Sequence, residues 1–338
     1  MSEIIKLVHG AGGVETQKII KELIANFTLR KVKNGTGIDE LDDSALIPIS
    51  KDEYLAITMD SYTVNPIFFP GGDIGKLAAC GTINDVAVMG AKPIAILDSI
   101  VVEEGFPKDT LLRIMSSFRR VIEKEKIALI GGDFKVMPKG SLDKIIISTV
   151  GVGIVKKKNL LTDFNVKPGD KIIVSGSVGE HGTVILALQL GLDLGNLKSD
   201  CDTVTRIIEV AQQIGGIHAA KDPTRGGLAM ALNEFAQKSK VTIVIDEEKI
   251  PIKEEVRSCT EMLGVDPLAL ACEGRVVLAV DKEKAEDIVK VLRKEGYTEA
   301  TIIGEVTNEE PGLVLLRSKV GGLRILEPPL GEIVPRIC

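Results

Sequence analysis

Short runs of β-branched residues alternate with amphipathic helical stripes along most of this chain. The runs at 94–102 and 145–155 are typical of strands, because branched side chains pack well on a pleated surface. Apolar residues recur at helical spacing from Leu111 to Ile122, which predicts an amphipathic helix over 109–125. The mixed order of the two kinds of element favours α+β domains over a single doubly wound sheet.

The same patterns predict the other elements and a domain boundary. A chain of 338 residues is long for a single core. The basic residues 156–158 and the turn 167–170 interrupt the pattern, so we expect an N-terminal domain over 1–155, a C-terminal domain over 156–326 and a tail over 327–338. Strands are expected at 54–59, 127–130, 171–178, 241–245, 275–280, 301–306 and 313–316, and helices at 204–214, 226–237 and 283–294.

The composition argues against several classes of protein. Lys and Arg number 42 against 48 Asp and Glu, a formal charge of −6, whereas a nucleic-acid surface needs a basic excess. No apolar run is long enough to span a bilayer, and the N-terminus lacks a signal-peptide core. The five cysteines are scattered, as in a reducing compartment. We expect a cytoplasmic protein that binds neither nucleic acid nor membrane.

Five aspartates stand at expected strand ends or glycine-rich turns: Asp43, Asp60, Asp85, Asp133 and Asp222. Each also has a structural explanation. An aspartate can cap a turn, and Asp222 followed by Pro223 is typical of a helix N-cap with proline at the first helical position. Taken together, however, carboxylates without a cysteine or histidine cluster favour a hard cation such as Mg²⁺, and therefore Mg-nucleotide chemistry.

Glycines and one lysine are further candidates for phosphate binding. Gly12 and Gly13 lie in a glycine-rich segment whose backbone N–H groups could approach phosphate oxygens, although a plain flexible turn explains them equally well. Lys76 could neutralise phosphate charge or simply be exposed on a helix. Asn84 precedes Asp85 and is expected on the same side of a helix, away from its packed apolar face.

The chain ends in a cysteine, Cys338, after a segment in which Pro328, Pro329 and Pro335 disfavour a helix. Twelve extended residues reach roughly 40 Å. A terminal thiol on such a tail could visit another protein's active site. A frayed terminus that happens to end in cysteine is the alternative.

Together these motifs resemble the HypE family of hydrogenase maturation factors, within the PurM-like superfamily of ATP-dependent enzymes. The resemblance covers essentially the whole chain, and the ending Pro-Arg-Ile-Cys is its most discriminating part. Phe134 stands where a threonine is common in the superfamily, which leaves a hydroxyl contact there in doubt. The motifs are 42–45, 59–64, 68–77, 81–90, 131–133, 222–227 and 335–338.

The resemblance implies a homodimer whose N-terminal domains share a β-barrel, with ATP between the barrel and the C-terminal domain. It implies that the carbamoyltransferase HypF loads a carbamoyl group onto Cys338. ATP then drives dehydration of this thiocarboxamide to a thiocyanate. The cyano group passes to iron on the HypC–HypD complex and becomes a cyanide ligand of [NiFe] hydrogenase.

Dehydration requires that the amide oxygen be phosphorylated and that a base remove protons from the amide nitrogen. On the resemblance, Glu273 is the candidate base and Lys135 its partner. A turn carboxylate paired with Arg275 is the alternative explanation for Glu273. Two other functions remain open: a non-catalytic thiol carrier with a regulatory ATP site, and a PurM-like small-molecule kinase or synthetase.

Overall fold

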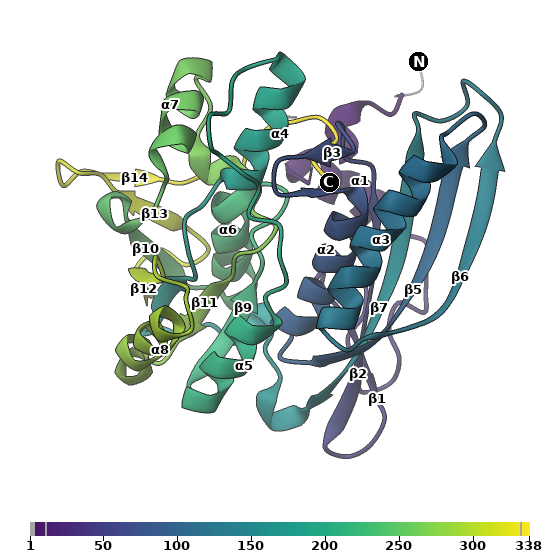
Figure 1. The fold of residues 1–338 in the computed structure, drawn as a ribbon. Helices are drawn as coiled ribbons and strands as arrows, with labels where there is room; N and C mark the ends of the chain where they lie inside the picture. The colour runs from purple at the N-terminus through teal and green to yellow at the C-terminus, as the bar shows by residue number, and fades with distance from the viewer. Residues whose placement is uncertain (1–3, 11, 332) are drawn as a thin grey trace.

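The computed structural model describes residues 4–10, 12–331 and 333–338 of the chain. Its two halves lie side by side, each built on its own sheet (Figure 1). Ala11 of the glycine-rich segment and Glu332 of the tail lie outside the described residues. Within them, no helix combines the length and the apolar character needed to cross a bilayer.

The N-terminal half is a five-stranded sheet with two helices on one face. Helix α2 (Ile74–Val88) packs on β2 and β7, and α3 (Lys108–Lys124) packs on α2. The strands pair antiparallel except for the parallel pair β5 and β6. In sheet order they are β1 (Ala45–Pro48), β2 (Glu53–Tyr62), β7 (Ile145–Lys156), β5 (Lys92–Glu103) and β6 (Ala128–Met137).

Strand β6 is the edge of this sheet, and all its residues are exposed. Ile130 and Phe134 are 62% and 51% exposed. The described strands of the chain close no barrel: the sheet runs from β1 to β6 as an open layer. An exposed apolar edge strand is a ready template for pairing with another chain.

The C-terminal half is a seven-stranded mixed sheet with helices on both faces. Ile172 packs toward α6 (Gly227–Ser239), and its neighbour Ile173 packs toward α5 (Thr205–Ile214) and α8 (Lys282–Lys294). This alternation is what a strand covered on both faces requires. In sheet order the strands are β14 (Leu323–Ile325), β13 (Val314–Arg317), β10 (Thr242–Asp246), β12 (Thr301–Thr307), β8 (Lys171–Val174), β11 (Val277–Val280) and β9 (Ile217–Lys221).

Smaller elements complete the chain. Helix α4 (Glu180–Leu190) and helix α7 (Glu254–Leu263) lie at one end of the C-terminal half (Figure 1). Helix α1 (Val14–Ile24), which the sequence patterns did not predict, contributes no buried residue. The remaining elements are the hairpin of β3 (Phe68–Phe69) with β4 (Gly72–Asp73) and the 3₁₀ turns Leu7–Gly10, Lys157–Asn159, Asp163–Asn165, Glu247–Lys249 and Pro267–Ala269.

Helix α2 lies between the two halves and is apolar on nearly every side. Its residues are almost all buried, as expected for a helix without a polar face. Asp73 caps its N-terminus by accepting from the N–H groups of Gly75 and Lys76. This burial fixes Asp85, near the end of α2, at the junction of the two halves.

Several boundary predictions were wrong; the strand expected over 171–178, for example, is β8 and ends at Val174. Strand β2 continues past Asp60 to Tyr62, and β6 continues through the glycine pair 131–132 to Met137, because both keep pairing with neighbouring strands. Asp222 does not cap a helix: α6 begins five residues later, after Gly226 in a left-handed conformation. That finding removes the structural explanation for Asp222.

Candidate active site

Four of the five predicted aspartates come together at the junction of the two halves. Asp43 precedes β1, Asp60 lies on β2, Asp85 lies on α2, and Asp222 directly follows β9. Asp85 accepts a hydrogen bond from the Thr58 hydroxyl at 2.7 Å. Two elements of one half and one strand of the other thus direct their carboxylates to the same place.

The pKa values of these carboxyls reflect their crowding. Burial raises the pKa of Asp85 well above its usual range, and the charges of Asp60, Asp222 and Asp43 raise it further. Burial and Asp43 act in the same way on Asp222. Burial also raises the pKa of Asp43, to about 6, although Lys221 opposes the shift. The cluster therefore concentrates more negative charge than its own cations neutralise.

These carboxylates fit a hard cation. The Oδ2 atoms of Asp43 and Asp222 are buried and have no hydrogen-bond partner among the described residues. Buried carboxylate oxygens normally have partners, so such atoms require an explanation. Mg²⁺ prefers oxygen ligands and is commonly held by one or two carboxylates together with phosphate oxygens. Asp43 and Asp222 are therefore the residues that would hold it.

Lys221 orders one side of the cluster, and the sequence patterns did not single it out. Its ammonium lies 2.8 Å from Asp43, 3.1 Å from Asp163 and 3.0 Å from Glu234. The side chain is almost fully buried. A buried lysine without such partners would lose its charge, so these contacts are what keep it cationic. Lys221 holds Asp43 by one oxygen and leaves the other free.

A cavity of about 280 Å³ opens beside the cluster, lined by Asp43, Asp222, Arg225 and Gly12 among others. Gly12 has a φ of +84°, and a Cβ there would collide with Arg225. A Cβ at Gly13 would lie 2.8 Å from the Pro329 carbonyl oxygen. The glycine turn therefore packs closely between the loop that follows Asp222 and the tail. A residue with a side chain at either glycine would not fit there.

The terminal cysteine lies in the same place. The C-terminus enters between the two halves (Figure 1), and Cys338 packs against the core that contains α2. Burial raises the pKa of its thiol to about 12; Arg225 opposes this shift, whereas Glu273, Asp60 and Asp85 add to it. The tail has no helix within its described residues, as predicted.

Glu273 is buried beside this thiol, and within the part of the chain that the structure describes its Oε1 atom has no hydrogen-bond partner. Burial raises its pKa well above the usual range, and nearby acidic groups, including Cys201, Asp222 and Asp200, raise it further. The alternative pairing with Arg275 is wrong, because that guanidinium bonds Glu180 at 2.6 Å and the Ser177 carbonyl at 2.9 Å. Glu273 therefore faces the site with an unengaged carboxyl oxygen.

Two predicted residues lie elsewhere in the single chain. Asp133 and Lys135 pair with each other at 2.9 Å on the exposed strand β6. Gly132 is paired with Asp98 of β5, Asp98 with Thr149 of β7, and Thr149 with Asp60 of β2, so Gly132 and Asp60 lie on the same face of the sheet. Asp133, the next residue, therefore lies on the opposite face, three strands away from Asp60. Within the described residues of a single chain, Lys135 therefore does not contact Glu273, and Asp133 does not lie with the other carboxylates, as was expected.

Asn84 differs from expectation, whereas Lys76 matches one of its two expected explanations. The Asn84 amide is fully buried; its oxygen accepts from the Val204 N–H at 2.9 Å, and its nitrogen donates to the Asp202 carbonyl at 3.1 Å. It therefore ties α2 to the C-terminal half rather than facing a phosphate. Lys76 is bonded to the Gly71 carbonyl at 3.0 Å near the start of α2, an exposed position that matches its alternative explanation.

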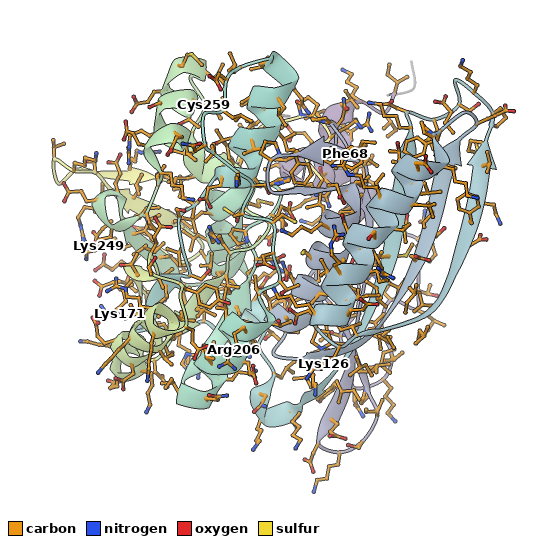
Figure 2. The ribbon with its side chains drawn as sticks, viewed as in Figure 1. Phe68, Lys126, Lys171, Arg206, Lys249 and Cys259 are labelled. Atoms are coloured by element: carbon orange, nitrogen blue, oxygen red, sulfur yellow. The ribbon has the colours of Figure 1, made fainter. Side chains whose placement is uncertain are left out.

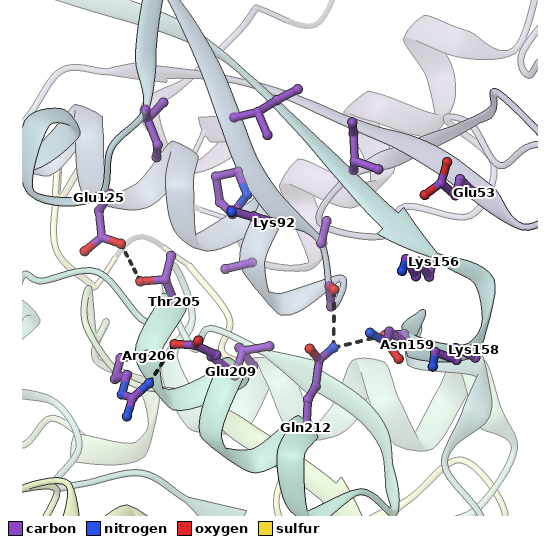
Figure 3. Close-up of a pocket in the computed structure, with 18 residues that line it drawn as sticks. Glu53, Lys92, Glu125, Lys156, Lys158, Asn159, Thr205, Arg206, Glu209 and Gln212 are labelled. Atoms are coloured by element: carbon purple, nitrogen blue, oxygen red, sulfur yellow. Dashed lines mark hydrogen bonds and ion pairs between the residues drawn. The ribbon is translucent and has the colours of Figure 1, made fainter.

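Two other features are separate from this cluster. A larger cavity of about 770 Å³ lies between β5, β7 and α5 (Figure 3), where Gln212 donates to the carbonyls of Gly90 and Asn159. It contains none of the predicted site residues. Asp170, His218 and Asp281 form a second group that could hold a metal. They lie just before β8, on β9 and just after β11, in the C-terminal half.

Comparison with known proteins decides the family. The family described as "AIR synthase related protein" matches twice, its N-terminal domain over residues 41–155 and its C-terminal domain over 167–315. A putative hydrogenase expression/formation protein of Methanocaldococcus jannaschii is 47% identical over 338 residues, 99% of each chain. Carbamoyl dehydratase HypE of Rhodobacter capsulatus is 39% identical over 343 residues, 99% of this chain and 98% of that protein. The chain belongs to the HypE family.

Solved HypE structures share the fold. A HypE–HypF complex superposes with a TM-score of 0.85 at 36% identity, covering 94% of this chain and all of the matched one. HypE in complex with ATP superposes with a TM-score of 0.81 at 37% identity, covering 99% and 100%. The expected PurM-like, two-domain α+β fold is confirmed.

Three residues of this HypE-family site were missed from sequence: Lys221, Arg225 and His181. Arg225 was quoted only as part of a loop motif, and its signal was a cation among glycines beside Asp222. His181 packs at the start of α4, which its position between Glu180 and Gly182 indicates, but its ring also contacts the Ile337 carbonyl at 2.8 Å. No local pattern pointed to that contact, because the two residues are 156 positions apart.

Proposed function

We propose that this HypE-family chain is an ATP-dependent carbamoyl dehydratase of [NiFe]-hydrogenase maturation, acting on a carbamoyl group carried by Cys338. The observation that supports this most directly is the position of the terminal thiol among Glu273, Arg225 and the aspartates. A pure carrier does not need its thiol buried beside an unpaired carboxylate. A small-molecule kinase does not need a terminal thiol there.

The proposed chemistry begins with attack of the thiocarboxamide oxygen on the γ-phosphorus of ATP, which forms a C–O–P linkage and releases ADP. One proton leaves the nitrogen with this step. The second leaves as the C–O bond breaks, giving a C≡N group and phosphate, so that the oxygen departs as part of the phosphate. No external oxidant is needed, because carbon keeps its oxidation state.

Each residue of the site has a part in this scheme. Asp43 and Asp222 would hold Mg²⁺, which supplies charge neutralisation for the phosphates. Arg225, whose pKa is raised first by Cys338 and then by Asp60 and Glu273, lies where it can stabilise negative charge on the reacting group. Glu273 accepts the first nitrogen-bound proton, and its raised pKa makes it a stronger base than an exposed glutamate; the departing phosphate takes the second proton.

The direct test is the mass of the C-terminal peptide. Carbamoylated protein incubated with Mg-ATP is expected to lose one water from that peptide, and Cys338→Ser is expected to carry no carbamoyl group and to show no change. Loss of water with purified protein alone excludes the non-catalytic carrier. If loaded wild-type protein hydrolyses ATP while its tail mass stays constant, the proposal is wrong.

The partners follow from the same proposal. A HypE–HypF complex is known among the relatives, and we propose that HypF loads this tail. Loading requires Cys338 to leave its buried position, so the tail over 327–338 moves between partners. Delivery of the cyano group to the HypC–HypD complex requires the same movement.

We further propose a homodimer formed through strand β6. A second copy would cover the exposed apolar residues of this edge and extend each sheet toward a shared barrel. The roles predicted for Asp133 and Lys135 then depend on this assembly, because in one chain both side chains point away from the cluster.

The dimer has its own test. Phe134→Glu places a charge on the exposed face of β6 and is expected to convert a dimeric protein into a monomer, measured by light scattering after size exclusion. Met59→Glu, at an exposed position of β2 in the same sheet, is the control that distinguishes the edge from the open face. A wild-type monomer at micromolar concentration would contradict the proposal.

A further inference from the structure

Helix α4 contacts the docked tail through two side chains. The Gln189 amide donates to the Pro335 carbonyl at 2.7 Å and to the Asn65 carbonyl of the N-terminal half, also at 2.7 Å. The His181 ring lies 2.8 Å from the Ile337 carbonyl oxygen. The two α4 residues are eight positions apart, so they share one face of the helix. The two carbonyls belong to alternate residues of the tail and point to the same side.

The main-chain oxygen atoms of Arg336 and Cys338 point to the other half of the molecule. The Arg336 carbonyl accepts from the Asn65 N–H at 3.1 Å, and the Cys338 carbonyl accepts from the Thr63 N–H at 3.0 Å. Residues 63 and 65 follow β2, in the N-terminal half. The end of the tail is therefore held between both halves, and its main chain rather than its side chains makes most of these contacts.

The hydrogen bonds around His181 define its protonation. The Ser199 hydroxyl oxygen already accepts from the Cys201 N–H at 3.1 Å, so its hydrogen is available for His181 Nδ1 at 2.7 Å. Nδ1 is then the acceptor, and Nε2 carries the hydrogen that it donates to the Ile337 carbonyl. Phe69 meets the imidazole edge-on, with ring centroids 5.3 Å apart. The ring is therefore fixed in position as a donor.

We propose that His181 and Gln189 are positioning residues that latch the tail and set how often Cys338 occupies the acidic site. This rests on the proposed function, in which Cys338 reacts while docked and is loaded while released. In the docked state Cys338 is partly buried against the core that contains α2; in the released state its thiol is exposed. Weakening the latch is therefore expected to slow the dehydration that takes place while Cys338 is docked, without slowing the carbamoyl loading that takes place while it is released.

The latch can be measured without any enzymatic step, by alkylating Cys338 with iodoacetamide and following the C-terminal peptide by mass spectrometry. Cys259, partly exposed on α7 and labelled in Figure 2, makes none of the hydrogen bonds that hold the tail and is an internal reference thiol. Removing one donor leaves a carbonyl without its partner, so His181→Leu and Gln189→Leu are each expected to speed alkylation of Cys338 about tenfold, with Cys259 unchanged.

The same variants are expected to lose water from the tail about tenfold more slowly with ATP, while carbamoyl loading by HypF stays the same or becomes faster. His181→Gln is expected to restore slow alkylation, because its amide nitrogen can replace Nε2 as donor. Gln212→Leu is the matched control: that glutamine also donates to two backbone carbonyls, but beside the large cavity of Figure 3.

The outcomes separate the two proposals. If alkylation of Cys338 is unchanged in Gln189→Leu and in His181→Leu, or rises equally in Gln212→Leu, there is no latch. If His181→Leu does not fold, Gln189→Leu alone decides, because Gln189 is partly exposed at the end of α4. If alkylation rises as expected but wild-type protein never loses water, the latch stands and the dehydratase proposal fails.

Discussion

Replacing Glu273 by glutamine is expected to slow ATP-dependent water loss from the carbamoylated tail by about 10²- to 10⁴-fold, the usual contribution of a positioned general base. Glutamine keeps the size of the side chain but cannot accept a proton. Carbamoyl loading and ATP binding are expected to stay near wild type. The measurement is the single-turnover rate of mass loss from the C-terminal peptide.

The same substitution is expected to raise the melting temperature by a few degrees at pH 8 in metal-free buffer. The folded-state pKa of Glu273 is raised, so its ionised form is unfavourable in the folded protein and costs stability as pH rises above the usual glutamate range. Glutamine stays neutral and avoids that cost. Glu286→Gln, at an exposed carboxylate of α8, is the control and is expected to change neither quantity. Water loss at the wild-type rate in Glu273→Gln would remove Glu273 from the mechanism.

Stability of the metal-free protein is expected to fall as pH rises from about 4 to about 7 and beyond. Most of the acidic groups at this junction have raised folded-state pKa values, with Asp43 at about 6 and Asp42 at about 7. Within that window the folded state binds more protons than the unfolded state, so the free energy of unfolding decreases with pH. Asp163, whose pKa Lys221 and Lys238 lower against the effect of burial, contributes in the opposite direction.

Mg²⁺ is expected to reverse this loss. At a concentration about 100 times its dissociation constant, a ligand of the folded state adds about 2.7 kcal/mol, or about 4 °C in melting temperature for a chain of this size. The stabilisation is expected to be larger at pH 8 than at pH 5.5, where protons compete for the carboxylates. Differential scanning fluorimetry with Mg²⁺ and with chelator measures both effects.

Two variants locate the binding site. Asp222→Asn removes a carboxylate with an unpaired buried oxygen and is expected to abolish most of the Mg²⁺ effect. His218→Gln disrupts the separate group of Asp170, His218 and Asp281 and is expected to leave it intact. If the Mg²⁺ effect survives in Asp222→Asn and disappears in His218→Gln, the cation binds at Asp170, His218 and Asp281, and its proposed site at Asp43 and Asp222 is wrong.

Much of the fold was predictable because its signals are local. Strand β7 and helix α3 were predicted within one residue at each end, since strand and helix periodicities are set by neighbouring residues. Helix α1 was missed, and no buried face marks it. The ends of β2 and β6 were misplaced because pairing with other strands, which the segment itself does not encode, carried them past Asp60 and through the glycine pair 131–132.

The sequence by itself determined the chemistry available to this protein: a terminal thiol, a set of aspartates without soft metal ligands, and the two-domain fold that carries them. Only the tertiary structure decided which of these groups meet. It placed Asp43, Asp60, Asp85 and Asp222 around Cys338 and left Asp133 on the opposite face, because side chains alternate across a strand and a change of one residue reverses the face. It also supplied Lys221 and His181, whose contacts join segments far apart in the chain and therefore leave no local pattern.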